Sequence, residues 1–444
     1  MPLRIIDTLA SNESLADLFS DRQVLQAMLD FEAALARAEA IHGMIPLDAA
    51  RAIGREAVAD NFDAASISRQ AQRAGTPAIP LVKKLTEHVR ATDPDAARFV
   101  HWGATSQDVT DTALILLLKR ARTLLAAHHQ RLLVALRKLA AQHEHTVMLG
   151  RTLLQPAPPV TFGLKAANWY AAVKRGWSRI DTRFVEAEVL EFGGASGTLA
   201  ALGDRGDDVG RALAEELGLT YPDAPWHTQR DSLAALLAAC SVQCGSLGKI
   251  ARDIALLMQG EVGEASEAGG DGRGGSSTMP HKRNPIACSL ALASANRVPG
   301  LLASFLTSML EEHERGVGGW HAEWTIITSI IQALGLAVES MTEAAEGLVV
   351  DPAKMRANVD ATHGAIFAER VMMLLGEVLG RDVAHTLLEE AARKTAGENR
   401  RFVEVLADMP EVTRVIAPET LRTLDVPEDY LGMAAAFQKR LLGE

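Results

Sequence analysis

Apolar side chains recur every three or four positions through most of this chain, which is the spacing of an amphipathic helix. The longest such pattern begins near Asp108 and continues to about Glu144. Further long patterns predict helices over residues 159–191, 229–260, 285–313 and 320–348. Five long helices in succession predict a helical bundle as the central domain of the protein.

Shorter helical patterns flank this central region, so the predicted fold class is all-α. Within the first of these regions, residues 75–80 are expected to be extended, because Pro77 and Pro80 disfavour a helix around them. The dipeptide Asp351-Pro352 marks the end of the last long helix. The predicted domains are an N-terminal helical domain over residues 1–107, the bundle over residues 108–350 and a smaller C-terminal helical domain over residues 351–444.

The composition agrees with a helical protein. Of the 444 residues, 48% are hydrophobic but only 5% are aromatic, and Ala and Leu predominate. Ala and Leu are strong helix formers, whereas aromatic and β-branched residues favour strands. The apolar faces of the long helices are wide, so burial against more than one neighbour is expected. This favours an oligomer.

The charge balance argues against two classes of partner. The 45 Lys and Arg residues are outnumbered by 56 Asp and Glu residues, which gives a formal net charge of −11. Such a surface repels nucleic acids and anionic membranes, so neither is expected to bind. The sequence also shows no run of about 18 uncharged apolar residues, so no membrane span is expected. An anionic substrate remains compatible with this charge if cations gather in one cleft.

The cysteines and the N-terminus indicate a cytoplasmic protein. Cys240, Cys244 and Cys288 are an odd number without a CxxC pair, as expected for reduced thiols. Residues 1–4 do not begin the apolar run of a signal peptide. We expect no cofactor and no metal, because the sequence has neither a glycine-rich nucleotide motif nor a His-Glu-x-x-His motif.

A polar, glycine-rich segment interrupts the long helices and is the strongest indication of chemistry. Residues 263–275 contain six glycines and lead into Ser276, Ser277, Lys282 and Asn284 before Pro285. Ordering such a loop costs conformational entropy, so a plain connection is rarely built this way. Its hydroxyls, amine and amide can bind and deprotonate an anionic substrate. We expect a flap that orders over a ligand; the alternative is a disordered surface insertion.

Three other polar segments border the helices, and each has two interpretations. In residues 101–108, Thr105 or Ser106 either caps the next helix or helps to form an anion site at its N-terminus. Residues 150–156 form either a turn between helices or a carboxylate-binding segment that uses Gln155. Residues 311–324 form either a kinked helix pair with a solvated charge cluster or part of a site.

Taken together, these segments resemble the signature regions of the fumarase/aspartase superfamily. Residues 275–285 are similar to its motif G-S-S-x-M-P-x-K-x-N-P, and residues 103–108 and 150–155 are similar to its first two regions. All three occur in the order of the family, so the resemblance covers essentially the whole chain. It implies a homotetramer whose active sites each take residues from three subunits. It also implies a reaction that breaks or forms a C–N or C–O bond β to a carboxylate.

The resemblance also implies roles for single residues. Ser276 would be the catalytic base, with an alkoxide stabilised by loop N–H groups and by cations such as Lys282. Arg273 and Arg283 are further candidate cations. Residues implied to bind a small polycarboxylate substrate are Thr76, Thr105, Ser106, Gln155, Ser277, Met279, His281, Asn284 and Arg315.

Two departures from the family pattern indicate which branch the chain resembles. Amine-releasing members carry a histidine at the position of Leu153, where it helps to protonate the leaving nitrogen. A carboxylate leaves as a stable anion and needs no such proton. In addition, Gly318-Gly319-Trp320 stands where adenylosuccinate lyases carry phosphate-binding serines, and Glu323-Trp324 stands where a Glu-Arg pair is usual. The chain is therefore most similar to the cycloisomerase branch, which closes a lactone.

Two alternatives remain open from the sequence. One is a lyase of the adenylosuccinate or argininosuccinate type, which releases an amine and fumarate. The other is a helical scaffold of the same fold without catalytic activity. The complete set of Ser276, Lys282 and Asn284 favours an enzyme over the scaffold.

Overall fold

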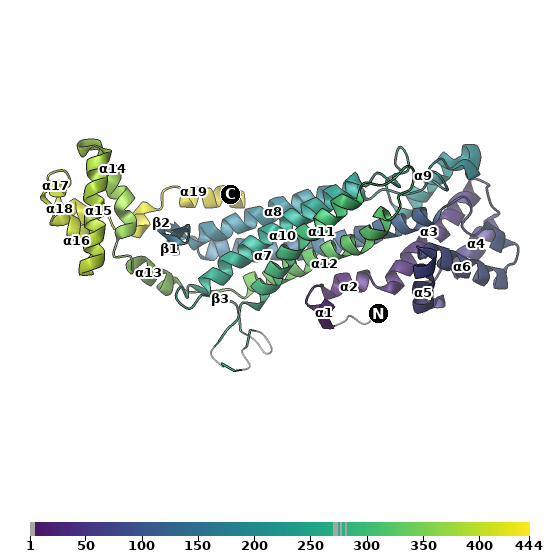
Figure 1. The fold of residues 1–444 in the computed structure, drawn as a ribbon, viewed down its shortest axis with the longest axis horizontal. Helices are drawn as coiled ribbons and strands as arrows, with labels where there is room; N and C mark the ends of the chain where they lie inside the picture. Colours follow the sequence, from purple (N-terminus) through teal and green to yellow (C-terminus); the bar gives the residue numbers. More distant parts are fainter. Residues whose placement is uncertain (1–4, 270–273, 276–277, 280–281) are drawn as a thin grey trace. The chain divides into compact units, whose positions relative to one another are not determined.

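The structure is a computed structural model that describes residues 5–269, 274–275, 278–279 and 282–444. It is almost entirely helical (Figure 1), which confirms the predicted all-α fold class. The five predicted long helices are all present, and each begins and ends within a few residues of its expected bounds. They are α7 (Ser106–Gln142), α8 (Phe162–Ala187), α10 (Asp231–Leu257), α11 (Ile286–Ser308) and α12 (Gly319–Glu346).

The chain divides into two compact units, and each unit is assembled from separate stretches of the sequence. Unit 1 comprises residues 1–130, 175–249 and 289–340, and unit 2 comprises residues 131–174, 250–288 and 341–444. The long helices contribute segments to both units, because the chain passes from one to the other within them. The linear domain bounds expected from the sequence stay a prediction.

Short helices complete unit 1. The longest of them is α3, whose buried face includes Leu25, Met28, Phe31 and Leu35 and packs against α4 and α9. The helices are α1 (Ile5–Thr8), α2 (Glu13–Leu18), α3 (Asp21–Ile41), α4 (Leu47–Glu56), α5 (Ala64–Ala74), α6 (Ala78–Thr92) and α9 (Gly206–Leu217). Shorter 3₁₀ turns are η1 (Ala59–Asn61), η2 (Ala96–Phe99) and η3 (Ala200–Arg205).

The expectation of an extended segment over residues 75–80 is wrong. Gly75 ends α5 with a φ of 73°, and α6 already begins at Ala78. Pro80 lies in the first turn of α6, where an N–H group has no partner within the helix. A proline there removes no hydrogen bond, so it starts the helix instead of preventing it.

The interpretation of residues 150–156 as a turn between helices is also wrong. Strands β1 (Val147–Thr152) and β2 (Gln155–Thr161) form an antiparallel hairpin in unit 2. Thr152 pairs with Gln155, so Leu153 and Leu154 are the two residues of the turn. The three prolines of β2 explain the strand, because they favour extended backbone over the interior of a helix. A second short pair joins β3 (Ala265–Ser266) to β4 (Val349–Val350).

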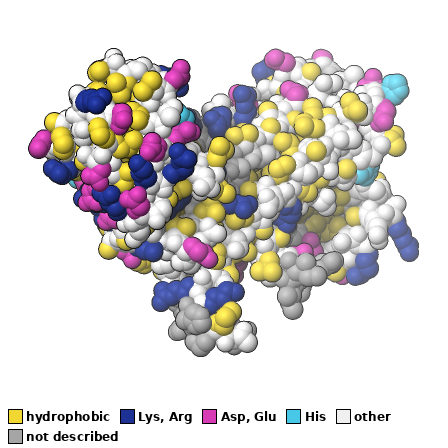
Figure 2. Space-filling view, turned by 60° about the vertical axis from the view of Figure 1, so that its left-hand side comes forward, with side chains coloured by type: hydrophobic (Ala, Val, Ile, Leu, Met, Phe, Trp, Pro, Cys, Tyr) yellow, Lys and Arg dark blue, Asp and Glu magenta, His cyan; other side chains and the backbone are white. Residues whose placement is uncertain are grey.

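Unit 2 ends in a group of C-terminal helices with their own apolar core. Leu375, Leu388, Phe402, Leu406 and Leu421 are among its buried members. Figure 2 shows Lys, Arg, Asp and Glu side chains mixed over the outer surface of this group. The helices that share this core are α14 (Ala368–Leu379), α15 (Arg381–Glu398), α16 (Phe402–Ala407), α17 (Pro410–Thr413) and α18 (Pro418–Leu421). Unit 2 also contains α13 (Pro352–Asp360), α19 (Ala434–Leu442) and the 3₁₀ turns η4 (Ala365–Phe367) and η5 (Pro427–Tyr430).

Three of the long helices are strongly apolar. By length and composition alone, α10, α11 and α12 could each cross a membrane, in windows that allow up to two charged residues. The expectation that no helix spans a membrane stays a prediction. Within the chain, 72% of the apolar window of α12 is buried, but only 28% of that of α11. The apolar surface of α11 thus lacks cover from its own chain.

Candidate functional site

The N-terminus of α7 is held by the buried carboxylate of Asp108. Its Oδ2 accepts hydrogen bonds from the backbone N–H groups of Thr105 and Gly194, each at 3.0 Å. Its Oδ1 accepts from the N–H of Gly193 at 3.1 Å and lies 2.7 Å from Nε2 of His227. The bond to Thr105 is the backward half of a capping box. The side chain of Asp108 therefore links the start of α7 to two segments distant in sequence, one at Gly193 and Gly194 and the other at His227.

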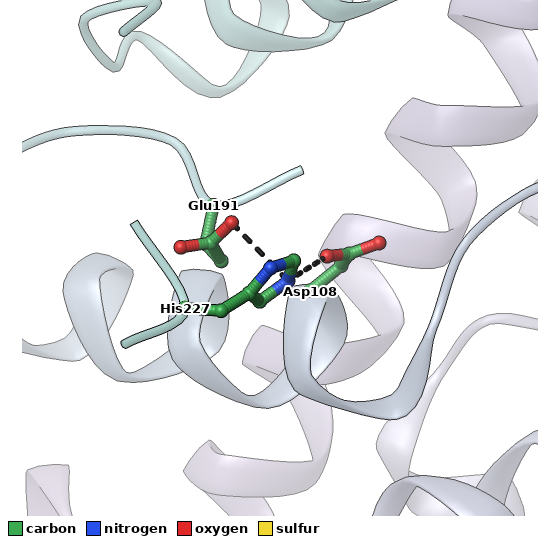
Figure 3. Close-up of side chains that lie close together, drawn as sticks. All are labelled: Asp108, Glu191 and His227. Atoms are coloured by element: carbon green, nitrogen blue, oxygen red, sulfur yellow. Dashed lines mark hydrogen bonds and ion pairs between the residues drawn. The ribbon is translucent and has the colours of Figure 1, made fainter. Parts of the chain in front are cut away.

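Glu191 and His227 complete a buried triad with Asp108. Figure 3 shows both carboxylates turned toward the imidazole ring. Oε1 of Glu191 lies 3.3 Å from Nε2 of His227, and its Oε2 accepts the backbone N–H of Trp226 at 2.9 Å. Burial and the neighbouring carboxylates of Asp111 and Asp108 raise the pKa of Glu191 to about 9. Glu191 is therefore protonated at neutral pH, which limits the negative charge buried in this triad.

The triad also has the donor set of a metal site, since its ligand atoms lie within 4.8 Å of one another. The 2.7 Å contact between Asp108 and His227 is a direct hydrogen bond, and both Asp108 oxygens accept backbone N–H groups as well. These bonds use the lone pairs that an ion would need. The geometry fits a hydrogen-bonded triad better than a metal centre.

A loop that follows α8 lies against the start of α7. Gly194 is so close to the carbonyl oxygen of Gly103 that a Cβ atom built on it would lie 2.8 Å away. The N–H of Leu199 closes the loop on the carbonyl of Gly193 at 2.9 Å. Nη2 of Arg315 donates to the carbonyl oxygens of Gly194 and Ala195, at 3.0 and 3.2 Å.

Three of the predicted site residues of unit 1, Thr105, Ser106 and Arg315, therefore lie at the start of α7 or at the loop against it, whereas Thr76 lies at the start of α6. The carboxylate of Asp108 accepts the N–H groups of both Thr105 and Gly194 and so joins Thr105 to the loop. Arg315 donates directly to the carbonyl oxygen of Gly194 in the same loop. Ser106 is the first residue of α7. Thr76 caps α6 through its Oγ1, which accepts the N–H of Ala78 at 3.3 Å.

A second buried charge network ties α7, α10 and α12 together. Arg230 precedes α10 and donates to Asp111 of α7 at 2.7 Å and to Glu323 of α12 at 2.6 Å. Asp111 also accepts the indole N–H of Trp320 at 2.9 Å and the amide of Gln107 at 3.0 Å. Burial lowers the pKa of Arg230, but the two carboxylates outweigh it and raise the pKa above its ordinary value. Glu323 and Trp320, noted in the sequence as departures from a phosphate site, thus have structural partners.

The hairpin of unit 2 carries Gln155 beside an unusual turn. Leu153 and Leu154 have φ angles of 50° and 66°, a region that side chains other than Gly, Asn and Asp seldom occupy. They are 96% and 75% exposed, and Gln155 is exposed next to them. One residue before the turn-flanking pair, Arg151 makes a two-pronged ion pair with buried Glu264, at 2.9 and 2.6 Å. This ion pair anchors the end of the hairpin that carries the strained, exposed apolar tip.

The glycine-rich loop is closed at its base within unit 2. The N–H of Asn284 donates to the carbonyl of Gly274 at 2.9 Å, and that of Lys282 donates to Met279 at 3.0 Å. Glu267 then caps α11, because its carboxylate accepts the N–H groups of Ala287 and Cys288. Lys282 and Met279 are exposed. Ser276, Ser277, His281 and Arg273 lie outside the described residues, and their roles stay predictions.

Comparisons with known proteins identify the family. The profile of a family described as "Lyase" matches residues 9–300, and one described as "Adenylosuccinate lyase C-terminus" matches residues 364–441. The chain belongs to the lyase family. This confirms the resemblance to the fumarase/aspartase superfamily that the signature regions indicated.

Individual members of the lyase family match along nearly the whole chain. A 3-carboxy-cis,cis-muconate cycloisomerase of Bradyrhizobium diazoefficiens is 46% identical, over 99% of this chain and 97% of that protein. A nitrosuccinate lyase of Streptomyces davaonensis is 41% identical, over 96% of this chain and 91% of that protein. The crystal structure of 3-carboxy-cis,cis-muconate lactonizing enzyme from Pseudomonas putida superposes with a TM-score of 0.93 at 43% identity, covering 99% and 98% of the two chains.

Sequence reasoning missed most of the buried polar residues of this lyase. The sequence points to Asp108 only as part of a motif, and it gives no reason to select Glu191, His227 or Arg230. Gln107 and Asp111 give a weak indication of a buried polar site, because they are polar residues in a stretch of α7 that is otherwise apolar. Glu191 and His227 lie in irregular segments, where periodicity gives no indication of burial.

Proposed function

We propose that this chain is a 3-carboxy-cis,cis-muconate cycloisomerase. It would convert 3-carboxy-cis,cis-muconate to 4-carboxymuconolactone, in the protocatechuate branch of the β-ketoadipate pathway. The observation that carries the proposal is the 46% identity to a cycloisomerase over 99% of the chain. Leu153 supports it, because this position at the hairpin tip offers no acid for a departing amine.

The proposed reaction is an addition across one double bond. A carboxylate oxygen of the substrate forms a C–O bond to one alkene carbon, and the π bond breaks. The adjacent carbon, α to another carboxylate, takes the proton of the Ser276 hydroxyl. In the reverse direction, the Ser276 alkoxide removes that proton, and the ring carboxylate leaves. Negative charge that develops on the α-carboxylate is stabilised by Lys282 and Asn284.

Residues of unit 1 are suited to hold a second carboxylate. The start of α7 presents backbone N–H groups and the positive end of a helix dipole beside Thr105 and Ser106. Thr76 and Arg315 remain proposed contacts by resemblance. Nη2 of Arg315 is engaged with two loop carbonyls, so its binding role would rest on its other nitrogens. Gln155, His281, Ser277 and Met279 are proposed for the remaining substrate contacts.

We infer a homotetramer with active sites shared between subunits. Only 28% of the apolar window of α11 is buried within the chain. Its exposed positions include Ala293, Gly300, Ala303 and Ser304, whose small side chains let another helix approach closely. Figure 2 also shows hydrophobic side chains over the exposed surface of the long helices. Helices of other copies would cover these faces, and we propose that the protein is cytoplasmic and binds neither a membrane nor a nucleic acid.

A direct assay tests the proposed function. Purified protein is mixed with 3-carboxy-cis,cis-muconate, and the ultraviolet absorbance of the conjugated diene is followed. Cyclisation consumes one double bond, so the absorbance falls, and the lactone is identified by mass and NMR. Nitrosuccinate, adenylosuccinate and argininosuccinate are tested in parallel. Turnover of one of these with a stable muconate signal would replace the cycloisomerase with a lyase that releases a nitrogen group. No turnover at all would favour the scaffold.

A further inference from the structure

The loop of residues 193–199 is held from both of its sides, which leaves its middle free. Asp108 accepts the N–H groups of Gly193 and Gly194. Arg315 donates to the carbonyl oxygens of Gly194 and Ala195. The bond from the N–H of Leu199 to Gly193 closes the loop at 2.9 Å. These contacts fix the ends of the loop and turn two carbonyl groups toward the guanidinium.

The middle of the loop offers donors without acceptors. Among the described residues, no partner binds the hydroxyls of Ser196 and Thr198, and residues 194–197 form a turn. Ser196 and Thr198 are exposed. Gly194 and Gly197 have φ angles of 67° and 79°, which turn the backbone where successive N–H groups can converge. Free N–H groups in such turns form concave anion sites.

The position of the loop connects it to the substrate. Gly194 packs on the carbonyl of Gly103, and Asp108 joins Gly194 to Thr105 through one carboxylate oxygen. Thr105 and Ser106 lie at the start of α7, where one substrate carboxylate is proposed to bind. The loop is therefore a neighbour of that subsite, and the guanidinium of Arg315 adds a positive charge beside it.

We propose that residues 195–198 form a carboxylate-binding loop of the substrate site. The inference rests on the proposed function, in which the substrate carries three carboxylates. Lys282 with Asn284, and Thr105 with Ser106, account for two of them. The hydroxyls of Ser196 and Thr198 and the neighbouring N–H groups receive the third, the 3-carboxylate that distinguishes this substrate from simple dicarboxylates. Arg315 positions the loop by holding its carbonyl oxygens.

The test compares two ligands that do not react and differ by one carboxylate. Propane-1,2,3-tricarboxylate and glutarate are titrated calorimetrically into the full-length wild-type protein, into the double variant Ser196→Ala/Thr198→Val and into Thr386→Val. Thr386 is an exposed threonine of α15 whose hydroxyl bonds its own helix, so its variant is the matched control. Loss of a charge-assisted hydrogen bond is expected to weaken tricarboxylate binding about tenfold in the double variant. Glutarate binding should stay within about twofold of the wild type.

The outcomes separate this inference from the proposed function. Equal weakening of both ligands, no weakening of either, or a wild type that binds the two ligands equally well would overturn the loop assignment. If the ligands are discriminated as expected but 3-carboxy-cis,cis-muconate is not turned over, the loop assignment stands and the cycloisomerase is rejected. If turnover occurs while the double variant binds like the wild type, the function stands and the loop is rejected.

Discussion

At the scale of single residues, the buried acids outnumber the buried bases. Glu39 of α3 is fully buried, and neither of its carboxylate oxygens has a hydrogen-bond partner among the described residues. Burial, and then the charge of Glu32, raises the pKa of Glu39 to about 9. Its unfolded pKa is near the ordinary value of 4.5. Between these two values, the folded chain keeps a proton that the unfolded chain releases.

Stability should therefore fall as pH rises from about 5 toward 9. The folded pKa is raised, so the stabilisation is complete below the unfolded pKa and is lost as the pH approaches the folded one. One such group changes the free energy of unfolding by about 1.4 kcal/mol per pH unit. Glu39→Gln should remove this contribution to the pH dependence of the free energy of unfolding, as measured by urea unfolding at pH 6 and pH 8. The control is Glu215→Gln, an exposed residue of α9 that should leave the slope unchanged. An unchanged slope in Glu39→Gln would mean that Glu39 is ionised when folded.

Ser276 provides the corresponding catalytic prediction. Ser276→Ala should lower kcat for 3-carboxy-cis,cis-muconate by at least about 10²-fold, because it removes the group that is proposed to transfer the proton. Its melting temperature should stay close to that of the wild type, since loop substitutions of this size seldom change stability by more than about 0.5 kcal/mol. Ser68→Ala on the exposed face of α5 serves as control. A folded Ser276→Ala protein with near wild-type turnover would place the base elsewhere.

The residues of the site differ in how far sequence reasoning could reach them. Thr105, Asp108 and Asn284 belong to motifs, so their resemblance alone directed attention to them. His227 contacts Asp108 across 119 positions of sequence, and Arg230 contacts Asp111 across 119 as well. Such pairs depend on how helices and loops pack, and no local pattern encodes that packing. A buried histidine or arginine in an irregular segment looks like a surface residue until its partners are known.

At the scale of elements, the long helices were predictable and the hairpin was not. Amphipathic periodicity extends over many turns in α7, so its ends were located within a few residues. Residues 147–161 lack such a pattern, so residues 150–156 suggest a turn between helices or a carboxylate-binding segment but not a strand. The structure uses the prolines in β2, where three of them stabilise an extended strand. The same residue type thus starts helices at Pro352, Pro410 and Pro418 but maintains a strand here.

The turn of this hairpin gives a prediction in which stability and activity diverge. Both central residues have positive φ, the geometry in which Asn-Gly is preferred. Leu153→Asn combined with Leu154→Gly should raise the free energy of unfolding by about 1 kcal/mol through relief of that strain. The same change removes two exposed apolar side chains next to Gln155, so kcat/KM should fall if the tip lines the substrate site. Chemical denaturation and the diene assay measure the two effects. A variant that is less stable than the wild type would show that the leucines are not strained.

The buried network of Arg230 supports a second prediction at this scale. Arg230→Met leaves the carboxylates of Asp111 and Glu323 buried without their cation. Breaking a buried pair in this way typically costs about 3–5 kcal/mol, so the variant should unfold at a much lower urea concentration. Arg211→Met is the matched control, because the ion pair of Arg211 with Asp207 is exposed and screened by solvent, so its loss should change the urea midpoint far less. Equal losses in the two variants would contradict a stabilising role for the buried network.

At the scale of the whole molecule, the incomplete burial of α11 argues for association. The window of α12 is 72% buried by its own chain, whereas that of α11 is only 28% buried. If other copies cover α11, the protein should sediment at four times its chain mass of 47.6 kDa. Ala303 lies exposed on this helix, and a charged side chain there would have to be buried in a tetramer. Ala303→Glu should therefore lower the mass measured by analytical ultracentrifugation, and it should lower turnover as well, because each active site is proposed to take residues from several subunits.

The helix itself should survive this substitution, because Ala and Glu are both good helix formers. Circular dichroism of Ala303→Glu is thus expected to show a helical protein, which separates dissociation from unfolding. Ala396→Glu introduces the same charge on exposed α15, within the mixed-charge surface of the C-terminal helices, and should leave mass and turnover unchanged. A tetramer that tolerates Ala303→Glu would place the subunit contacts on other helices. A wild-type monomer with full activity would contradict shared active sites altogether, and the open face of α11 would then need another partner.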